Sequence, residues 1–441
     1  MPGKLETWPT WPEYNFSKSE ADPTGSLLQI KQEIISEYGE SALRQAWLKV
    51  CSELSKITDD IAEKGTDIIP EVNFDELFHL DTEKKEELKD KGCFVVRGVV
   101  DKEVADGWFA GLKEYVEKNK QKVIGWPAET PSILRLYWSP TQLAIRSHPN
   151  QLRIQKELNS WWHDDSSPAQ TSSDPLTYVD AVRIRPPGIP FFGLGPHIDA
   201  GSLCRWGDKT YRSVYSSIFS GNPEKHDPYD LTVRQKADQA LYQGSAHSTV
   251  LRSFQGWTAL TTAGKQEGSL LLYPNVKVAI AYLLLRPFFS PPNSSSEEDI
   301  LDASKWTFDA NTPWFPGTFR ETSQYASLIS HPHLKMRECM VHIPTMHPGD
   351  TIWWHADMIH AVEVDHFGSG DSSVAYVAAT PTTDTNVKYI KGQLKSFLDG
   401  GRAPEDFWSA DLVPESEYQG YLGEGGILSG EQGRKAMGFG L

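Results

Sequence analysis

The chain has 441 residues, of which 39% are hydrophobic, and it contains 15 tryptophans. This apolar content is enough for one large domain or two smaller ones and excludes a globally disordered chain. The formal net charge of −16 would repel a phosphate backbone or an anionic membrane surface, so we expect neither nucleic acid nor membrane as a partner.

Cysteine usage and hydropathy both indicate a reducing compartment. The four cysteines (Cys51, Cys93, Cys204 and Cys339) have neither the paired spacing of a zinc site nor the density of a secreted disulfide scaffold. The start MPGKLETWPTWPEYNF lacks the apolar core of a signal peptide, and the longest apolar run, residues 278–285, is too short to span a bilayer. The sequence therefore predicts reduced thiols and a cytoplasmic location.

Residues 1–120 predict a helical N-terminal region that packs on the core and contains one short strand. Residues 26–64 carry apolar side chains at three- and four-residue spacing, the period of amphipathic helices. Residues 80–118 predict a helix, a buried strand at Cys93–Val96 after Gly92, and a second helix capped by Asp101. We expect this unit to lie like a lid beside the core, and residues 121–175 to form a helical connection.

From about Leu176 the chain changes to short β-rich runs punctuated by Pro, Gly and Asn. The runs are residues 177–188, 254–263, 268–275, 337–350, 351–364 and 372–381. This texture is typical of a β-sandwich or barrel, so we predict a mainly β fold with flanking helices and a core at 176–390. Insertions near 207–243 and 287–330 are expected at its mouth, and residues 391–441 are expected to form a C-terminal extension.

The tripeptide pattern His-x-Asp occurs four times, and its context differs at each place. The pairs are His79/Asp81, His163/Asp165, His197/Asp199 and His355/Asp357. Asp81 is better explained as a helix cap, and His163 lies in a polar loop that predicts solvated surface. By contrast, His197 and Asp199 close a segment that resembles a strand, where the two-residue period points both side chains to one face.

A further histidine would complete a set of two histidines and one carboxylate, which holds Fe(II) while leaving positions open for a co-substrate and O₂. His360 fits, because a Pro-Gly-Asp turn ending at Asp350 starts a strand with His360 at its far end. A compact alternative is His355, Asp357 and His360, but His360 falls on the opposite face of a regular strand from His355. We therefore favour His197, Asp199 and His360. His355 is then a hydrogen-bonding or wall residue beside the ligands, or a core histidine.

These segments resemble the Fe(II)/2-oxoglutarate-dependent oxygenases, especially the phytanoyl-CoA hydroxylase-like branch. There a Gly-Asp turn leads into the strand that ends with the second metal histidine. Residues 256–275 resemble the central pair of strands of that branch, and residues 89–100 resemble its N-terminal strand. More closely, the chain resembles an oxygenase-like family of bacteria and fungi catalogued as domain of unknown function 1479. The resemblance implies a double-stranded β-helix core, of the jelly-roll or cupin-like type, that uses Fe(II), 2-oxoglutarate and O₂.

The chain departs from that branch at one position. The branch has an arginine about a dozen residues beyond the distal histidine, where this chain has Ser372 and Ser373. A serine cannot offer the bidentate charged fork that an arginine gives the far carboxylate of 2-oxoglutarate. In this fold the last strand lies between the first and third, so a neighbouring strand could supply the cation. The candidates are Arg183 and Arg185 on the first strand and Arg252 before the third, and each could equally be a surface arginine.

Trp257 aligns by the resemblance with an aromatic residue beside the co-substrate, although the position suits a core tryptophan equally well. The first functional hypothesis is an oxygenase that hydroxylates, desaturates or cyclises a small molecule. The alternative is a non-catalytic cupin-like binding protein, supported by the missing arginine, and a zinc isomerase or hydrolase could use the same ligands. The surplus of arginines near the barrel strands favours a substrate with a carboxylate, such as an amino acid.

Overall fold

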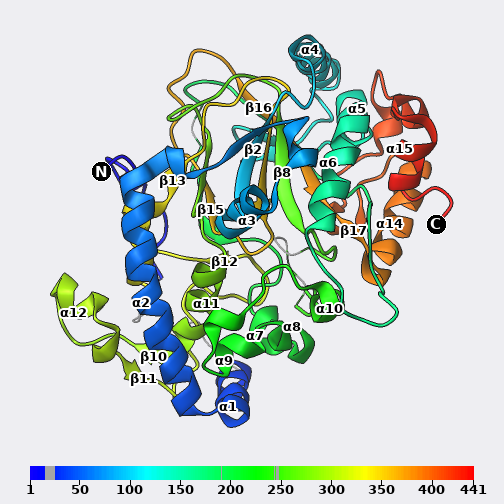
Figure 1. Cartoon of the computed structure of the whole chain (residues 1–441). Helices are drawn as coiled ribbons and strands as arrows, with labels where there is room; N and C mark the ends of the chain where they lie inside the picture. The colour runs from blue at the N-terminus through cyan, green and yellow to red at the C-terminus, as the bar shows by residue number, and fades with distance from the viewer. Residues whose placement is uncertain (15–24, 190, 243, 245–247) are drawn as a thin grey trace.

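The centre of the protein is a pair of β-sheets (Figure 1). The structure is a computed structural model, and it describes residues 1–14, 25–189, 191–242, 244 and 248–441. The larger sheet has the strand order β1-β2-β14-β8-β16-β6-β4-β3, and the smaller one has the order β12-β7-β15-β9-β13. The strands of these two sheets are β1 (Glu71–Asn73), β2 (Cys93–Arg97), β3 (Gly125–Trp126), β4 (Ile133–Leu134), β6 (Val182–Arg185), β7 (Leu194–Ile198), β8 (Phe254–Ala259), β9 (Leu270–Leu272), β12 (Gln324–Tyr325), β13 (Val341–His342), β14 (Thr351–His355), β15 (His360–Val362) and β16 (Ser372–Ala379). Two small ribbons pair β5 (Ser172–Pro175) with β17 (Pro381–Thr382) and β10 (Phe289–Ser290) with β11 (Thr307–Phe308).

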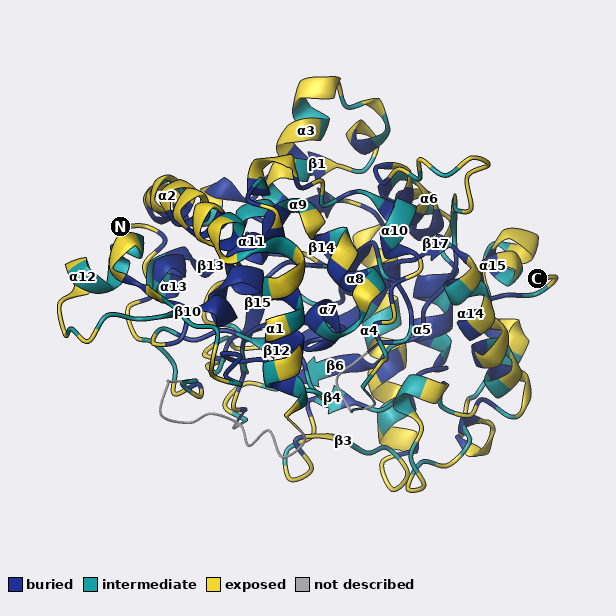
Figure 2. Cartoon of the chain, turned by 90° about the horizontal axis from the view of Figure 1, so that it is seen from below, coloured by how far each residue is buried: buried dark blue, intermediate teal, exposed yellow. Residues whose placement is uncertain are grey.

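The α-helices surround the sheets (Figure 1). They are α1 (Ser26–Tyr38), α2 (Glu40–Lys64), α3 (Thr82–Lys91), α4 (Lys102–Lys118), α5 (Pro140–Arg146), α6 (Pro149–Ser160), α7 (Cys204–Gly207), α8 (Lys209–Val214), α9 (Ser216–Phe219), α10 (Leu231–Arg234), α11 (Lys277–Leu285), α12 (Glu297–Leu301), α13 (Met336–Cys339), α14 (Asp384–Leu398) and α15 (Gly430–Ala436). α5 and α6 contact β16 of the larger sheet, and α2 packs against α11. The two chain ends lie on opposite sides of the molecule (Figures 1 and 2).

The chain passes from the larger sheet to the smaller one between β6 and β7, between β8 and β9, and between β14 and β15. β16 lies between β6 and β8 and is antiparallel to both. In the smaller sheet β7 and β15 are antiparallel neighbours, and their register places His197 opposite His360. The strand pairing therefore brings together two histidines that are far apart in the sequence.

Alternating side chains of the larger sheet enter two different apolar clusters. Ile352 and Val374 belong to the cluster shared with the smaller sheet, whereas Trp353 and Ala375 join the cluster that contains α6 residues. This is the period of two that a strand buried on both faces requires. Trp353 is fully buried, so its replacement by Ala should cost about 3–5 kcal/mol of stability. Figure 2 shows buried strands at the centre of the molecule and helices such as α2 and α3 exposed on their outer faces.

Three expectations from the sequence need correction. The chain is a mixed helix and sheet protein rather than a mainly β one, because the helices contain more described residues than the strands. Some of these helical residues lie in the expected insertion 207–243, which contains α8, α9 and α10. Residue 243 itself lies outside the described residues.

Contrary to the expectation from the sequence, the strand at Cys93–Arg97 does not belong to a lid beside the core. β2 pairs with β1 on one side and with β14 on the other, so it is a strand of the larger sheet. The reason is burial, because Cys93, Phe94, Val95 and Val96 are all buried and a lid would leave one face open. Finally, the side chain of Asp101 makes no capping hydrogen bond, although it precedes α4.

None of the helices in the described part of the chain combines the length and the apolar character needed to cross a bilayer.

Candidate metal centre

The three side chains predicted as metal ligands lie together between the two sheets. One ligand atom from each of His197, Asp199 and His360 lies within 4.8 Å of the others. His197 Nε2 is 3.5 Å from Asp199 Oδ1, and His360 Nε2 is 3.5 Å from Asp199 Oδ2. Over the described residues this is the one cluster of three or more His, Cys, Asp or Glu side chains that could hold a metal ion.

Both imidazole rings are held from behind by backbone carbonyl groups. His197 Nδ1 donates to the carbonyl oxygen of Gly195 at 2.7 Å, and His360 Nδ1 donates to that of Met358 at 3.0 Å. A carbonyl can only accept, so each Nδ1 carries a proton and each Nε2 is the ring nitrogen left to bind a metal ion. This outer hydrogen bond is the one that metal-binding histidines use to fix their tautomer and ring orientation.

Asp199 is fixed by two further side chains that the sequence analysis did not identify. Gln255 Nε2 donates to Oδ2 at 2.7 Å, and Ser323 Oγ donates to Oδ1 at 3.2 Å. The amide of Gln255 is itself oriented by Trp354 Nε1, which donates to its oxygen at 3.0 Å. Gln255 shares a strand face with Trp257, so the two-residue period could have placed it in the site. Ser323 lies in the long insertion, where no period is available.

The electrostatics of the cluster favour an ionised carboxylate. Burial opposes ionisation of Asp199, but the adjacent imidazoles of His197 and His360 hold its pKa well below the ordinary value. Burial also lowers the pKa of His360, assisted by the positive field of His197, while Asp199 outweighs burial and raises the pKa of His197. Metal binding needs an ionised carboxylate and neutral imidazoles, so a bound cation would displace the remaining proton.

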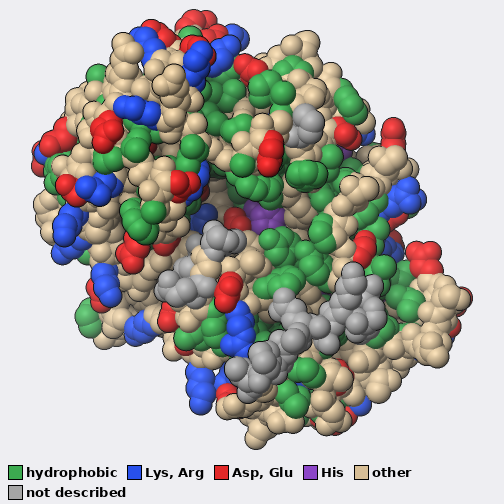
Figure 3. Space-filling model, turned by 180° about the vertical axis from the view of Figure 1, so that it is seen from behind, with side chains coloured by type: hydrophobic (Ala, Val, Ile, Leu, Met, Phe, Trp, Pro, Cys, Tyr) green, Lys and Arg blue, Asp and Glu red, His purple; other side chains and the backbone are tan. Residues whose placement is uncertain are grey.

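The cluster lines a cavity of about 330 Å³, which is at the lower end of the size of small-molecule sites, about 300–1,000 Å³. Figure 3 shows a hollow on this face of the molecule with histidine and acidic side chains at its bottom. Apart from the ligands, the cavity is lined by Ile133, Asp180, Arg183, Leu194, Arg252, Gln255, Gly256, Trp257, Leu270, Trp354, Val362, Tyr376 and Val377.

Arg183 extends from β6 into this cavity and has no acidic partner. It is only 3% exposed, and no described carboxylate lies within 4.0 Å of its guanidinium. Its Nη2 lies 3.5 Å from Ser372 Oγ, and its Nε has no hydrogen-bond partner among the described residues. The neighbouring strand therefore places a cation beside Ser372. Ser373 has a structural contact instead, because its Oγ donates to the Arg183 carbonyl oxygen at 2.8 Å.

The other predicted cofactor residues divide between the cavity and its surroundings. Arg252 and Trp257 line the cavity. Arg185 does not, because its guanidinium donates to the carbonyl oxygen of Glu363 at 2.7 Å and to that of Val364. Arg185 thus ties β6 to the segment after β15.

His355 points away from the cluster, and the compact alternative set does not converge. His355 Nε2 donates to the carbonyl oxygen of Pro228 at 3.1 Å, and its Nδ1 accepts the backbone N–H of Asp357 at 3.0 Å. The ring stacks on Trp162 with centroids 4.7 Å apart, and burial lowers the pKa of His355 to about 3. Asp357 is paired with Arg234 and lies away from the cavity.

The remaining His-x-Asp pairs are explained without a metal. His163 is 42% exposed and lies 3.1 Å from both Asp165 and Asp227, as expected for a solvated loop. Asp81 caps α3 by accepting the backbone N–H of Lys84 at 2.8 Å.

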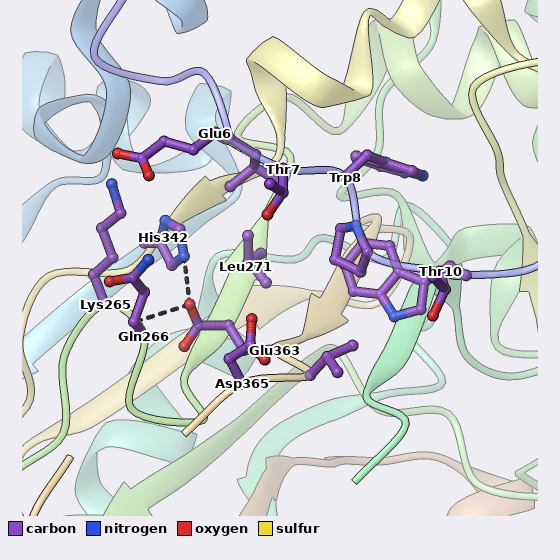
Figure 4. A pocket seen from close by; sticks show the side chains of 14 residues that line it. Glu6, Thr7, Trp8, Thr10, Lys265, Gln266, Leu271, His342, Glu363 and Asp365 are labelled. Atoms are coloured by element: carbon purple, nitrogen blue, oxygen red, sulfur yellow. Dashed lines mark hydrogen bonds and ion pairs between the residues drawn. The ribbon is translucent and has the colours of Figure 1, made fainter. Parts of the chain in front are cut away.

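A second cavity, of about 260 Å³, lies between N-terminal residues 5–11 and residues 265, 266, 271 and 363–365 (Figure 4). Its most buried acid is Glu363, whose carboxylate accepts hydrogen bonds from His342 Nε2 at 2.5 Å and from the backbone N–H of Gln266 at 2.9 Å and Ser269 at 2.8 Å. These donors satisfy both carboxylate oxygens, so Glu363 holds the loop before β9 in place.

Comparison with known proteins agrees with this architecture. The Gig2-like family matches residues 23–439. The GlcNAc Inducible Gene 2 protein of Candida albicans, identified with domain of unknown function 1479, is 28% identical with a TM-score of 0.84, over 96% of this chain and 90% of that one. A Salmonella typhimurium LT2 protein, provisionally named an oxidoreductase, is 28% identical with a TM-score of 0.79, over 96% and 99% of the two chains. The Escherichia coli K12 protein YbiU is 28% identical over 443 residues, 95% of this chain and 97% of that one. Because the family match spans almost the whole sequence, the chain belongs to the Gig2-like family.

Proposed function

We propose that this protein is a non-haem Fe(II)/2-oxoglutarate-dependent oxygenase that oxidises an unactivated C–H bond of a small molecule. The observation that carries the proposal is the cluster of His197, Asp199 and His360 in a cavity that also contains the buried Arg183, which has no ion-pair partner among the described residues. The provisional name of the Salmonella relative belongs to the same broad class of enzyme.

The strand order supports a double-stranded β-helix, the jelly-roll or cupin-like core of such oxygenases. Along the chain, β6, β7, β8, β9, β13, β14, β15 and β16 supply two four-stranded layers. One layer has the order β14-β8-β16-β6, and the other has the order β7-β15-β9-β13. The ligands come from the end of β7 and from β15, which are neighbours in the second layer.

The donor set fits Fe(II). Two imidazole nitrogens and one carboxylate are the facial set of non-haem Fe(II) oxygenases, which leaves the opposite positions open. His197 and His360 would bind through Nε2, because their Nδ1 atoms are engaged by backbone carbonyls. Bound Fe(II) would supply the activation of O₂, with one oxygen atom entering the substrate as hydroxyl and the other entering succinate as 2-oxoglutarate loses CO₂.

Arg183 is the residue that we assign to the far carboxylate of 2-oxoglutarate. A buried guanidinium without a carboxylate is costly, and a bound dicarboxylate would give it a bidentate partner. Ser372 could add a hydrogen bond, while Trp257 and Tyr376 form walls of the same cavity. An arginine from the adjacent strand thus supplies the cation missing from β16, and this favours an oxygenase over the non-catalytic binding protein. It also favours an anionic co-substrate over zinc hydrolysis, which needs none.

Anaerobic titration of the protein with Fe(II) and 2-oxoglutarate tests the proposal. The chelate of the two on this ligand set should give a weak visible charge-transfer band that is absent with either component alone. Zn(II) in place of Fe(II) is the control and should give no band. If no band forms and Fe(II) supports no succinate release with a panel of small molecules, the oxygenase proposal is wrong and the binding-protein alternative replaces it.

A further inference from the structure

Two charged side chains in the cavity are not used by the proposed metal and co-substrate. Arg252 and Asp180 both line it together with His197, Asp199 and His360. Neither has an ion-pair partner within 4.0 Å among the described side chains, and they do not pair with each other. A guanidinium and a carboxylate are therefore held apart on the wall of one cavity.

The backbone fixes both groups in place. The Asp180 carbonyl oxygen accepts hydrogen bonds from Gln142 Nε2 at 3.1 Å and from Arg146 Nη2 at 2.7 Å. One carboxylate oxygen of Asp180 accepts the backbone N–H of Ala181 at 2.6 Å, which leaves the other oxygen for a ligand. On the other side, Leu251, the residue before Arg252, is held through both its N–H and its carbonyl by Asn386.

The charged groups of Arg252 and Asp180 interact electrostatically across the cavity. Burial raises the pKa of Asp180, and Arg252 is the first of the groups that counteract this rise. Burial lowers the pKa of Arg252, but Tyr178, Asp199 and Asp180 together outweigh it and raise the value. The guanidinium also lies over the ring of Tyr178, 5.5 Å from its centroid. Arg252 thus remains a cation that faces three carboxylates, those of Asp199, Asp180 and Asp406, and forms no ion pair within 4.0 Å with any of them among the described residues.

A charge balance then indicates what else the cavity can accept. The two positive charges of Fe(II) would be balanced by Asp199 and by the carboxylate of 2-oxoglutarate nearest the metal. Arg183 would balance the far carboxylate. Among the charged side chains that line the cavity, this leaves one positive charge at Arg252 and one negative charge at Asp180, which are separated and fixed. A neutral apolar substrate would leave both groups unpaired, and a simple anion would leave Asp180 unpaired, each at a cost in affinity.

We propose that the substrate is a small zwitterion, an α-amino acid or a compound with the same paired groups, whose carboxylate binds Arg252 and whose ammonium group binds Asp180. This inference rests on the proposed oxygenase function, because it assigns the other charges of the cavity to the metal and to 2-oxoglutarate. Because Arg252 and Asp180 would hold the carboxylate and the ammonium group, the side chain of the amino acid is the part left to face the metal ligands.

Ligand-observed NMR on the protein loaded with Zn(II) and 2-oxoglutarate tests the inference without turnover. The probes are the standard amino acids, each with a matched compound that lacks the amino group and a matched compound that lacks the carboxylate. We expect binding by a subset of the amino acids and at least about 100-fold weaker binding of their matched compounds, since each would leave one partly buried charge without its partner. Equal binding of the matched compounds, or no binding by any amino acid, overturns the inference.

Two variants assign the roles. Arg252→Gln should weaken amino acid binding at least about 100-fold, and Arg252→Lys should restore part of it. Asp180→Asn should allow the compound without the amino group to bind as well as the amino acid does. Arg153→Gln, on the exposed face of α6, is the matched control and should bind like the wild type. Thermal unfolding of each variant checks that the fold is retained.

The Fe(II)/2-oxoglutarate charge-transfer band separates this inference from the proposed function. The band should be unchanged in Arg252→Gln and Asp180→Asn. Loss of the band in Arg252→Gln would mean that Arg252 holds 2-oxoglutarate, and the inference would be wrong. Absence of the band from the wild type would instead count against the oxygenase proposal. Failure of amino acids to bind a protein that does form the band would count against the zwitterion alone.

Discussion

Arg205 donates a hydrogen bond from Nη2 to the backbone carbonyl oxygen of Asp199 over 3.1 Å. The same guanidinium lies 3.5 Å from Asp357 Oδ1, and Asp357 is in the turn that connects β14 to β15 and leads to His360. Arg205 and Asp357 are each 1% exposed. A buried ion pair thus links the segment that supplies Asp199 with the segment that supplies His360. Asp357 belonged to the compact alternative set of metal ligands, whereas in the structure it pairs with Arg205 and Arg234 and connects the two segments.

Replacing Asp357 by Asn should lower both stability and metal affinity. Arg205 and Arg234 would be left buried without their carboxylate, which costs about 3–5 kcal/mol. Displacement of the turn before His360 should weaken metal binding by about 10–100-fold. Denaturant unfolding measures the first effect, and titration of the apo-protein with Fe(II) measures the second. Asp75→Asn, at an exposed position whose side chain makes no capping hydrogen bond, is the control. A loss of stability with unchanged metal affinity would show that the network does not position the ligands.

His197→Ala and Asp199→Ala should each abolish stoichiometric iron binding, because three ligands are needed to hold the ion on one face. Both residues lie at the edge of a cavity, so the fold should survive, and metal content after gel filtration is the measurement. His163→Ala and His79→Ala are the controls and should retain iron, since neither residue lies near the cluster. Iron loss in His163→Ala with retention in His197→Ala would show that the assignment is wrong.

His360→Ala and His355→Ala separate the two possible ligand sets. The first should eliminate iron binding. The second should retain iron with reduced affinity, because His355 contacts Pro228 and Asp357 but none of the three ligands. His355→Ala should also lower stability through the loss of its stacking on Trp162. The measurement is iron stoichiometry in both variants, and equal loss would favour the compact set.

Local patterns in the sequence predicted the strands of the six β-rich runs and named the three side chains that the structure brings together. Each of the six β-rich runs contains a strand, and the two-residue period correctly placed Arg183 and Arg185 on one face of β6. The two-residue period could not show that Arg183 lines the cavity while Arg185 does not. That difference arises because the segment after β15 lies beside Arg185 and accepts its hydrogen bonds. Ser323 and Asp180 were missed for a similar reason. Both lie in irregular segments that reach the cavity through long-range packing, for which a single sequence has no local signal.

Glu415 should make stability depend on pH. Its carboxylate accepts the backbone N–H groups of Tyr137 at 2.6 Å and Trp138 at 3.0 Å, yet burial raises its pKa to about 7. The value in an unfolded chain is about 4.3, so between these pH values the folded protein holds a proton that the unfolded chain releases. The contribution to stability is therefore complete below pH about 4.3 and is lost as the pH rises through about 7.

Glu415→Gln should remove that loss, since the amide oxygen can accept the same two N–H groups and carries no charge. We expect the variant to be more stable than the wild type at pH 8 by up to about 3–4 kcal/mol and similar to it near pH 4. Denaturant unfolding at several pH values is the measurement. Glu417→Gln, which is exposed in the same turn, is the control, and parallel pH profiles for all three proteins would contradict the prediction.

Arg183→Ala should weaken 2-oxoglutarate binding far more than changes at the serines of β16. A buried carboxylate left without its cation costs about 3–5 kcal/mol, or two to four orders of magnitude in affinity. Ser372→Ala removes at most one neutral hydrogen bond, worth about 0.5–1.5 kcal/mol, and Ser373→Ala should have no direct effect on the ligand. Titration of the charge-transfer band with 2-oxoglutarate gives the dissociation constant for each variant. Arg185→Ala is the matched arginine control, and it should lower stability through its lost contacts to the Glu363 and Val364 carbonyls while the folded fraction retains normal 2-oxoglutarate affinity. If Arg183→Ala and Ser372→Ala weaken binding equally, the far carboxylate is held elsewhere and β6 does not replace the missing arginine.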